Sequence, residues 1–420
     1  MGEWDKIMET TADIAEVYEK SVVPTYTPGV ALIKGKGTKV WDAEGKVYLD
    51  FAAGIAVLNL GHCHPMVTEA ITRQAAELGH VSNLYYNEKQ ASLAAKLSDL
   101  AGGGKCFFCN SGAEANEAMI KLARAWGRDR GKSEIISMRN SFHGRTLGAM
   151  AATGQKKIQN GFDPIPAGFH YAEFNDLESV AALVSGTTAA ILVEAVQGEG
   201  GVIPATREFM QGLRALCDAK GLLLLCDEVQ CGMGRTGKWF SFEHSGIKPD
   251  AFSLAKSLGN GFPIGAMVAS DSCCDVLQPG SHASTFGGTP LACAAALATI
   301  SGIEMERLLM KSTKSGALLK GKLEAFVDRY EHVVGVRGQG LMLGLVLDVP
   351  AKEIVDAMFD IGLITIATAE NVIRIVPPLN VDEEEIEEAI DIMEDALAEW
   401  HGVELAEPEE EDDPLAVATE

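Results

Sequence analysis

The chain has 420 residues, 47% of them hydrophobic, and carries 35 basic against 59 acidic residues for a net charge of −24. This length predicts two domains or one large one. The acidic balance argues against a nucleic-acid-binding protein, which needs a basic footprint. No stretch of about 20 residues is apolar enough to span a bilayer. Because the opening residues lack the basic and apolar blocks of a signal peptide, we expect a cytoplasmic protein.

The cysteines predict reduced thiols and no metal site. There are nine of them, an odd number in a long chain. Cys106 and Cys109 have metal-type spacing, but no second pair of that kind occurs. The two phenylalanines between them favour a buried strand, in which a free cysteine behaves as a small apolar residue.

The middle of the chain alternates between helical and strand patterns, which predicts a mostly parallel sheet covered by helices on both faces. This alternating part of the chain comes after a predicted amphipathic helix and a predicted three-stranded antiparallel meander. The expected helices are 4–20, 65–79, 88–100, 112–127, 206–219, 310–328, 351–360 and 382–400. The expected strands are 30–34, 38–42, 46–50, 105–109, 134–138, 189–194, 222–226, 333–337, 341–347, 362–366 and 372–375.

The change of pattern after about residue 310 predicts a second, smaller α+β domain formed by both chain ends. We expect residues 1–60 and 306–402 to form this small domain and residues 61–305 to form the large one. The last segment, 403–420, holds eight acidic residues and no basic ones. Such a composition is typical of a disordered, solvated tail.

The stretch from Leu222 to Gly265 is the most informative part of the chain. An apolar run ends at Asp227, and a second apolar run, 251–255, ends at Lys256 before a glycine-rich loop. Ligands of open α/β sheets bind at the carboxyl ends of strands. Pyridoxal phosphate requires a lysine for its Schiff base and an acidic group for its ring nitrogen. An Asp and a Lys alone also fit a strand cap and a solvated loop residue.

Two strand-to-helix segments add groups suited to a phosphate, a planar ring and a carboxylate. Ser111 with Glu114 matches the S-x-x-E capping box, and Gly112 would let a phosphate approach the helix N-terminus. Phe142 can stack on a ring, and Arg145 offers a planar fork for a carboxylate. Taken singly, these residues fit a capped helix, a core aromatic and a surface arginine equally well.

Further charged residues lie in apolar surroundings. Glu194 and Glu199 follow a buried strand, and Arg374 stands among valines and isoleucines. An arginine in such company requires a partner or a ligand. The segment 232–237 matches G-x-G-x-x-G, but it is separated from the preceding strand and does not open a helix. A nicotinamide-dependent dehydrogenase is therefore a poor alternative.

Together these segments closely resemble the class III, or subgroup II, pyridoxal-phosphate aminotransferases over roughly residues 25–398. Each match is weak alone, but their order along the chain is highly specific. The matching stretches are 61–65, 82–85, 107–118, 141–146, 194–200, 227–230, the Lys256 loop and 284–288.

The resemblance implies a fold type I homodimer with two active sites at its interface. Lys256 would carry pyridoxal phosphate, Asp227 would pair with the pyridine nitrogen, and glutamate with 2-oxoglutarate would be one substrate pair. The remaining cofactor contacts would be Ser111, Gly112, Ala113, Phe142, Glu194, Val229, Gln230 and, from the partner subunit, Thr285. The substrate contacts would be Arg145, Ser284, Arg374, Glu199 and Ile55, with Arg374 binding the α-carboxylate of glutamate and Glu199 covering it otherwise.

The substrate is less well defined than the reaction. Thr289 and Ala195 depart from the usual Asn and Pro of the family, but neither replaces a reacting group. Ile55 stands where ornithine-specific relatives carry Tyr, which favours an acylated amine, and the resemblance points to N2-acetylornithine. Ornithine, 4-aminobutyrate, succinylornithine and acetyl-lysine stay open. A binding protein that had lost catalysis would be expected to lack Lys256 or Asp227, and both are present.

Overall fold

The structure is a computed structural model, and it describes residues 8–402. The predicted acidic tail and the first residues of the predicted N-terminal helix lie outside the described residues. The helix that follows begins at Thr11, because Thr10 and Asp13 form a capping box in front of it. No helix among residues 8–402 is long and apolar enough to cross a membrane.

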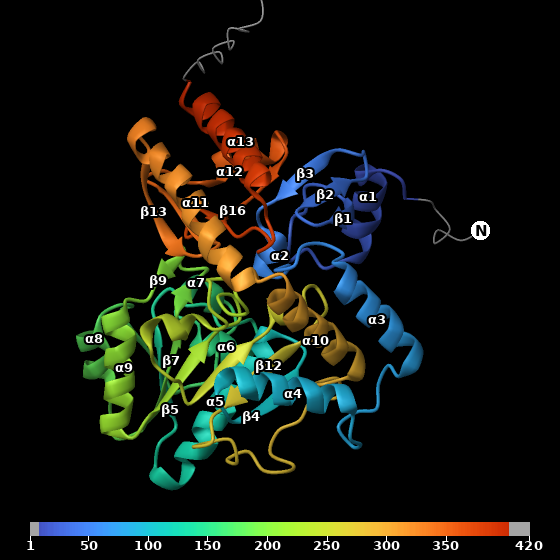
Figure 1. Cartoon of the computed structure of the whole chain (residues 1–420). Coiled ribbons are helices and arrows are strands. Elements are labelled where there is room, and N and C mark those ends of the chain that lie inside the picture. The colour runs from blue at the N-terminus through green and yellow to red at the C-terminus, as the bar shows by residue number, and fades with distance from the viewer. Residues whose placement is uncertain (1–7, 403–420) are drawn as a thin grey trace, which may run out of the picture.

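The helices and strands expected from the sequence are present in the expected order, and Figure 1 labels most of them. The helices are α1 (Thr11–Ser21), α2 (Ala53–Ala56), α3 (Pro65–Glu77), α4 (Glu88–Ala101), α5 (Gly112–Gly127), α6 (Leu147–Ala152), α7 (Lys156–Gln159), α8 (Leu177–Leu183), α9 (Arg207–Lys220), α10 (Pro290–Met305), α11 (Leu308–Arg329), α12 (Lys352–Asp360) and α13 (Glu383–His401). The strands are β1 (Leu32–Lys36), β2 (Lys39–Asp42), β3 (Val47–Asp50), β4 (Lys105–Cys109), β5 (Glu134–Met138), β6 (Phe169–Ala172), β7 (Thr188–Glu194), β8 (Val196–Gln197), β9 (Ile203–Pro204), β10 (Leu223–Asp227), β11 (Ala251–Leu254), β12 (Gly265–Ala269), β13 (Val333–Gln339), β14 (Met342–Leu347), β15 (Leu363–Ile364), β16 (Ile366–Thr368) and β17 (Val372–Ile375). The elements α2, α6, α7, α8, α10, β6, β8, β9 and β12 were not predicted.

A seven-stranded sheet in the order β4-β12-β11-β10-β7-β5-β6 forms the centre of the molecule. The pairs that β10 makes with β11 and β7 are parallel, as are those of β5 with β6 and β7. Only β12 runs against its neighbours in this sheet. The predicted mostly parallel sheet is therefore confirmed.

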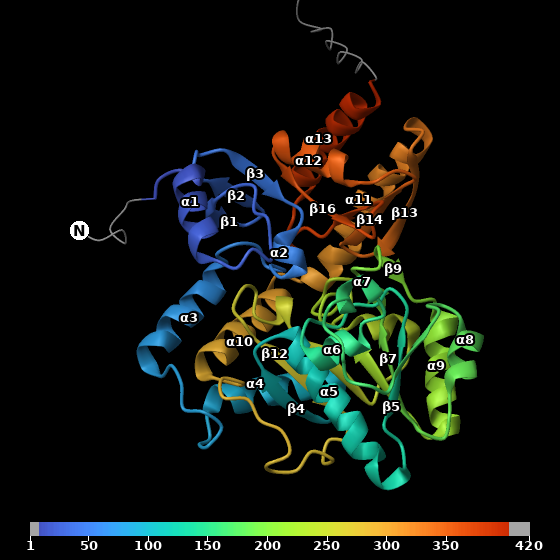
Figure 2. The same cartoon turned by 180° about the vertical axis from the view of Figure 1, so that it is seen from behind.

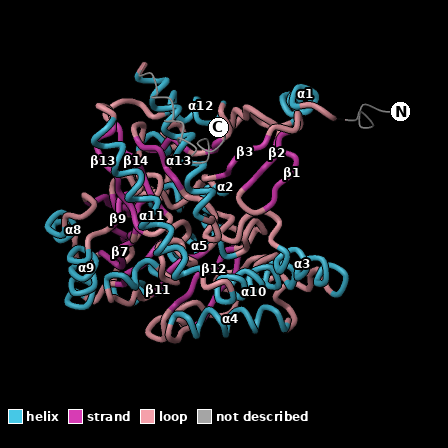
Figure 3. Tube along the Cα trace, turned by 45° about the horizontal axis from the view of Figure 1, so that its top comes forward, coloured by secondary structure: helices cyan, strands magenta, loops and turns pink. Residues whose placement is uncertain are grey.

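Both faces of this sheet are buried, which explains the continuous apolar runs of its strands. Leu225 packs with Leu122 of α5 in one core cluster, whereas Leu224 packs with Leu213 of α9 in the other. In Figure 3 the magenta strands run through the middle of the molecule and cyan helices lie around them. The two layers of helices leave the carboxyl ends of the strands free to form a site.

The two chain ends meet in space. The N-terminal strands form a sheet in the order β1-β2-β3-β15, in which Leu363 of the late strand β15 pairs with Leu49. A separate antiparallel sheet has the order β13-β14-β17-β16. Figures 1 and 2 both show the red and orange C-terminal elements beside the blue N-terminal strands, next to the central sheet. The division at residues 60 and 305 stays a prediction.

Candidate active site

Three strands of the central sheet end in residues that carry the chemistry. Asp227 is the last residue of β10, and the register places it beside Glu194 at the end of β7 and Ser253 in β11. Lys256 follows β11 after one residue. Because neighbouring parallel strands end at the same edge, side chains far apart in sequence meet here.

A cavity of about 410 Å³ lies at this edge. Its size suits a small-molecule ligand. The residues of the predicted site that line it are Ser111, Gly112, Ala113, Phe142, Arg145, Glu194, Asp227, Val229, Gln230 and Lys256.

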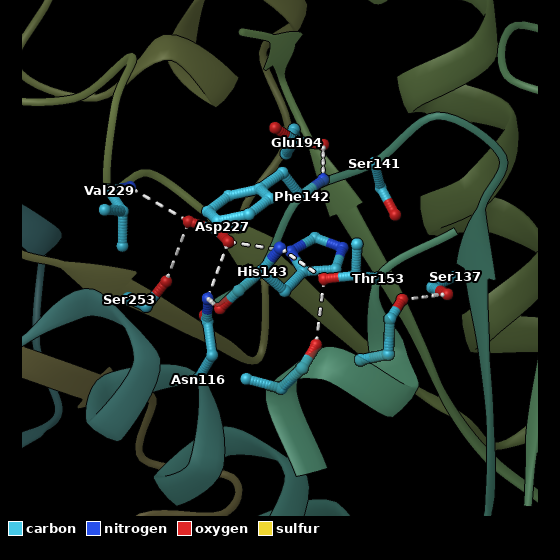
Figure 4. Close-up of polar contacts among 12 residues, drawn as sticks. Asn116, Ser137, Ser141, Phe142, His143, Thr153, Glu194, Asp227, Val229 and Ser253 are labelled. Atoms are coloured by element: carbon cyan, nitrogen blue, oxygen red, sulfur yellow. Dashed lines mark hydrogen bonds and ion pairs between the residues drawn. The ribbon is translucent and has the colours of Figure 1, made fainter. Parts of the chain in front are cut away.

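The carboxylate of Asp227 is held by four hydrogen bonds, which Figure 4 shows. Its Oδ2 accepts from Asn116 Nδ2 and from His143 Nδ1, each at 2.7 Å. Its Oδ1 accepts from the backbone N–H of Val229 at 3.0 Å and from Ser253 Oγ at 3.2 Å. A carboxylate only accepts, so the proton of this His143 contact is on Nδ1. These donors fix the direction of Asp227 and stabilise its negative charge.

His143 and Asn116 were not predicted as site residues. His143 is fully buried at its side chain, and its Nε2, like Asn116 Oδ1, has no hydrogen-bond partner among the described residues. A signal for both was present in the sequence. His143 directly follows Phe142, and Asn116 lies one helical turn after Gly112 on the same face of α5.

Lys256 loses its proton at a lower pH than an exposed lysine does. Burial, followed by the positive charge of Arg374, lowers the pKa of Lys256 to about 8. Its φ of 43° lies in the left-handed region, which is rare for a residue other than glycine and is typical of constrained functional positions. A buried lysine with a lowered pKa is a recognised form of activated nucleophile.

Glu194 is a second buried carboxyl next to Asp227. Burial, followed by the negative charge of Asp227, raises the pKa of Glu194 well above its ordinary value. Its Oε2 accepts a hydrogen bond from the backbone N–H of Phe142 at 3.2 Å. When two carboxyl groups lie this close, the negative charge of one disfavours ionisation of the other. Glu194 therefore retains its proton at a higher pH than an exposed glutamate does.

The N-terminus of α5 opens into the cavity. A Cβ on Gly112 would lie 2.7 Å from Val229 Cγ1, so the position requires glycine. Ser111 caps the helix by accepting from Glu114 N at 3.2 Å. The predicted capping box is only half correct, because the carboxylate of Glu114 accepts from Asn110 N at 2.5 Å. Free N–H groups and the helix dipole make this end suitable for a phosphate.

Two arginines differ in whether their charge is already paired. Arg145 lies 5.7 Å from the ring centroid of Phe142 and makes no ion pair within the described residues. Arg374 in β17 is 1% exposed, and its Nη1 donates to Glu199 Oε1 at 2.5 Å and to Gln230 Oε1 at 3.1 Å. Burial acts to raise the pKa of Glu199, but the charge and hydrogen bond of Arg374, with smaller contributions from Lys256 and Gln230, together lower it.

Five predicted site residues do not line the cavity: Arg374 and Glu199, which pair with each other, and Ser284, Thr285 and Ile55. Ser284 instead accepts a hydrogen bond from Asn110 Nδ2 at 3.2 Å, and Thr285 beside it is exposed. Ile55 is 42% exposed and has φ 67°, which is unusual for a β-branched residue. Ala53, Gly54 and Ala56 have positive φ values as well, so α2 is a left-handed turn.

The glycine-rich segment 232–237 does not lead into an α-helix, as a dinucleotide-binding loop would. It forms a turn and is followed by the short 3₁₀ helix η3 (Ser241–Ser245). Arg235 inside it is fully buried. The structure thus agrees with the rejection of a dinucleotide site at this segment.

Comparison with known proteins gives the family of this chain. Residues 21–397 match the family model described as aminotransferase class-III. The acetylornithine aminotransferase of Caldanaerobacter subterraneus subsp. tengcongensis is 50% identical over 388 residues, which cover 91% of this chain and 98% of the relative. The crystal structure of the ornithine aminotransferase from Toxoplasma gondii has a TM-score of 0.91 at 31% identity, covering 94% of this chain and 96% of that one. The acetylornithine aminotransferase from Elizabethkingia anophelis has a TM-score of 0.83 at 33% identity and covers 93% of this chain and 100% of that one.

The fold and the site are those of a pyridoxal-phosphate enzyme of fold type I. The chain belongs to the class III aminotransferases. The residues fit the cofactor of this family, because the cavity combines a glycine-dependent helix N-terminus, the buried carboxylate of Asp227 and the Lys256 amine.

Proposed function

We propose that this enzyme transfers the δ-amino group of N2-acetyl-L-ornithine to 2-oxoglutarate, giving N-acetylglutamate 5-semialdehyde and glutamate, a step of arginine biosynthesis. The observation that carries the proposal is the pair of arginines near Lys256, one unpaired and one neutralised by Glu199. Glutamate has two carboxylates and uses both arginines. Acetylornithine has one carboxylate, far from its reacting amine, and uses only one. The named relatives act as independent support for this substrate.

The cofactor roles follow from the donor set. Bound pyridoxal phosphate supplies an electron-withdrawing ring that stabilises negative charge on the substrate carbon next to the amine. Asp227 holds a proton on the ring nitrogen, and His143 with Asn116 orients that carboxylate. Phe142, Val229, Gly112 and Ala113 line the cavity. Phe142 and Val229 would pack against the ring, and Gly112 with Ala113 would bind the phosphate at the start of α5. Lys256 carries the cofactor at rest and moves the proton at the substrate carbon.

Glu194 and Gln230 provide further hydrogen-bonding groups near the cofactor ring. Glu194 lies at the end of β7 beside Asp227, with a raised pKa caused by burial and by that neighbour. It therefore adds a hydrogen-bonding carboxyl whose charged form is disfavoured. The side-chain oxygen of Gln230 accepts from Arg374 Nη1 at 3.1 Å, and Gln230 would also contact the ring hydroxyl.

Substrate exchange depends on Glu199. With acetylornithine bound, Glu199 stays on Arg374 and leaves no buried charge unpaired, which would cost several kcal/mol. With glutamate bound, the α-carboxylate replaces Glu199 on Arg374. Arg145 binds the single carboxylate of acetylornithine and the distal carboxylate of glutamate. The enzyme can in this way accept two substrates that differ in charge near the reacting carbon.

We also propose a homodimer, with a second copy of this chain covering the open side of the site. Tyr85 and Phe286 are large apolar side chains that are 70% and 59% exposed. Asn83 Nδ2 joins their two segments by donating to the carbonyl oxygen of Gly287 at 2.9 Å. Such an exposed apolar patch is typical of an interface. Thr285 in the same patch would reach the phosphate in the partner subunit.

Two further assignments belong to this proposal. The nine cysteines are free thiols, which fits the reducing conditions of the cytoplasm. Residues 1–60 and 306–402 act as one small domain that carries Arg374, and residues 61–305 carry the cofactor.

A panel of amino donors with 2-oxoglutarate tests the substrate. We expect kcat/KM for N2-acetylornithine to exceed that for ornithine, 4-aminobutyrate, succinylornithine and acetyl-lysine. The variant Ile55→Tyr should reduce the preference for acetylornithine over ornithine, because a hydroxyl suited to the free amino acid is introduced. A higher kcat/KM for any other donor of the panel would contradict the proposal.

A further inference from the structure

Arg235 lies in the glycine-rich turn that has no role in cofactor binding. Its side chain is 0% exposed. Its Nη1 donates to the carbonyl oxygens of Leu341, at 3.0 Å, and of Pro377, and its Nη2 donates to Asn59 Oδ1. Its Nε has no partner among the described residues. Every acceptor is thus a neutral oxygen.

A buried cation without a carboxylate partner is energetically unfavourable. Burial lowers the pKa of Arg235 to about 9. An apolar side chain at the same place would avoid this desolvation. The planar fork of the guanidinium does something that an apolar side chain cannot do, because it directs hydrogen bonds to several acceptors at once.

The three acceptors belong to three distant parts of the chain. Asn59 follows α2 in the N-terminal segment, Leu341 lies in the turn between β13 and β14, and Pro377 follows β17. The backbone adds two more links, because the carbonyl oxygen of Arg235 accepts from Leu341 N at 3.1 Å and from Ser312 Oγ at 2.9 Å. One residue of the central unit therefore connects both chain ends.

The connection to Pro377 matters for the active site. Pro377 is three residues after Arg374, whose Nη1 reaches Glu199 and Gln230. Gln230 and Arg235 belong to the same segment after β10. Arg374 thus extends from the C-terminal sheet toward the cavity, and Arg235 extends from the cavity side toward the end of β17.

We propose that Arg235 is a positioning residue that holds the end of β17, and with it Arg374, in place for the carboxylate next to the substrate amine. The inference rests on the role proposed above for Arg374. It makes Arg235 a determinant of specificity for glutamate and 2-oxoglutarate, although it does not contact the cavity. Acetylornithine, whose carboxylate binds Arg145, should depend on it much less.

The test is Arg235→Lys, which keeps the charge but loses the fork, measured in the full-length holoenzyme. We expect KM for 2-oxoglutarate to rise by about tenfold or more, since small misplacements of binding groups have large effects. KM for acetylornithine and the visible absorbance of the bound cofactor should stay near those of the wild type. Amide hydrogen exchange should increase in residues 372–379 and stay unchanged in β10. The exposed Arg128→Lys serves as the matched control.

A general loss of stability would raise both KM values and increase exchange in β10 as well, and that result would overturn the proposal. An unchanged KM for 2-oxoglutarate would overturn it too. If Arg235→Lys does not fold, Asn59→Ala removes a single acceptor of Arg235. It should also raise KM for 2-oxoglutarate, by a smaller factor, and leave KM for acetylornithine unchanged. Arg374→Gln is measured in parallel. If it leaves KM for 2-oxoglutarate unchanged, the role proposed for Arg374 is wrong. If it raises that KM and Arg235→Lys does not, only the role of Arg235 is wrong.

Discussion

Arg374 Nη1 lies 2.5 Å from Glu199 Oε1, and this contact joins strand β17 to the turn between β8 and β9. The arginine is buried, whereas the side chain of Glu199 is 30% exposed. The exposed partner is the one that can leave. A substrate carboxylate can then take its place on the guanidinium without leaving a buried charge unpaired.

The first prediction concerns Glu199→Ala. Without the competing carboxylate, Arg374 stays available to substrate, so the half-reaction with glutamate should be kept or become faster. The half-reaction with acetylornithine should slow, because a buried positive charge is left unpaired. Stopped-flow absorbance, with each substrate mixed separately with the holoenzyme, measures the two rates.

Glu173→Ala is the matched control for this change, since Glu173 pairs with Arg139 at 2.6 Å on the surface. It should alter neither half-reaction, because exposed ion pairs contribute little. Equal slowing of both half-reactions in Glu199→Ala would mean that Glu199 is a structural carboxylate and not an exchangeable one.

The second prediction concerns Asp227→Asn. The shape of the side chain is kept, but the negative charge that holds a proton on the ring nitrogen is lost. We expect kcat to fall by about 10²–10³-fold, as when one preorganised electrostatic contact is removed, while the cofactor still binds. Asp250→Asn, at the opposite end of the neighbouring strand, controls for the loss of an aspartate. Normal turnover with weakened cofactor binding would show that Asp227 only anchors the cofactor.

The third prediction concerns the pH dependence of Lys256 in the cofactor-free enzyme. Its pKa is lowered to about 8 by burial and by Arg374, so the neutral amine is present above that pH and is lost as the pH falls through it. Labelling with a small acylating reagent, read by peptide mass spectrometry, should therefore reach a plateau above about pH 8. Exposed Lys157 in the same sample is the internal reference.

Arg374→Gln should shift this midpoint upward, because one of the two causes of the lowered pKa is removed and Glu199 is freed. A labelling rate for Lys256 that still rises steeply through pH 10 would contradict the assignment. Lys256→Ala should lose both the labelled peptide and transamination.

The fourth prediction links the cofactor to the dimer. If Thr285 reaches the phosphate in the partner subunit, Thr285→Ala should weaken cofactor affinity although Thr285 does not line the cavity of its own chain. Cofactor at 100 times its dissociation constant should add about 2.7 kcal/mol of apparent stability. Thr187→Ala, at the far end of the central sheet, is the control. A fully active monomer in sedimentation velocity at low concentration would refute the shared site.

The strand ends that carry the site could be predicted because the order of neighbouring residues is enough to recognise them. The apolar runs that end at Asp227 and Lys256 are continuous, since both faces of the sheet are covered. The helix starting at Gly112 was equally clear, because a serine cap and a glycine precede an apolar face. These features depend only on neighbouring residues.

The rest depends on contacts that no local pattern contains. Glu194 lies beside Asp227 only because β7 and β10 are neighbours in the sheet, and that order follows from the whole packing. Strand β12 itself was not predicted, and its antiparallel direction likewise depends on the packing of the whole sheet. His143 and Asn116 are hydrogen-bonded to Asp227 only because the fold brings these distant residues together. The burial of Arg235 was not predicted, because its segment was considered only as a possible dinucleotide-binding loop.

The most direct test of the central claim is a single-turnover experiment with the purified holoenzyme and N2-acetylornithine in the absence of any oxo acid. We expect one equivalent of N-acetylglutamate 5-semialdehyde per active site, followed by one equivalent of glutamate when 2-oxoglutarate is added. No aldehyde from acetylornithine, or a faster full equivalent from free ornithine under the same conditions, would contradict it.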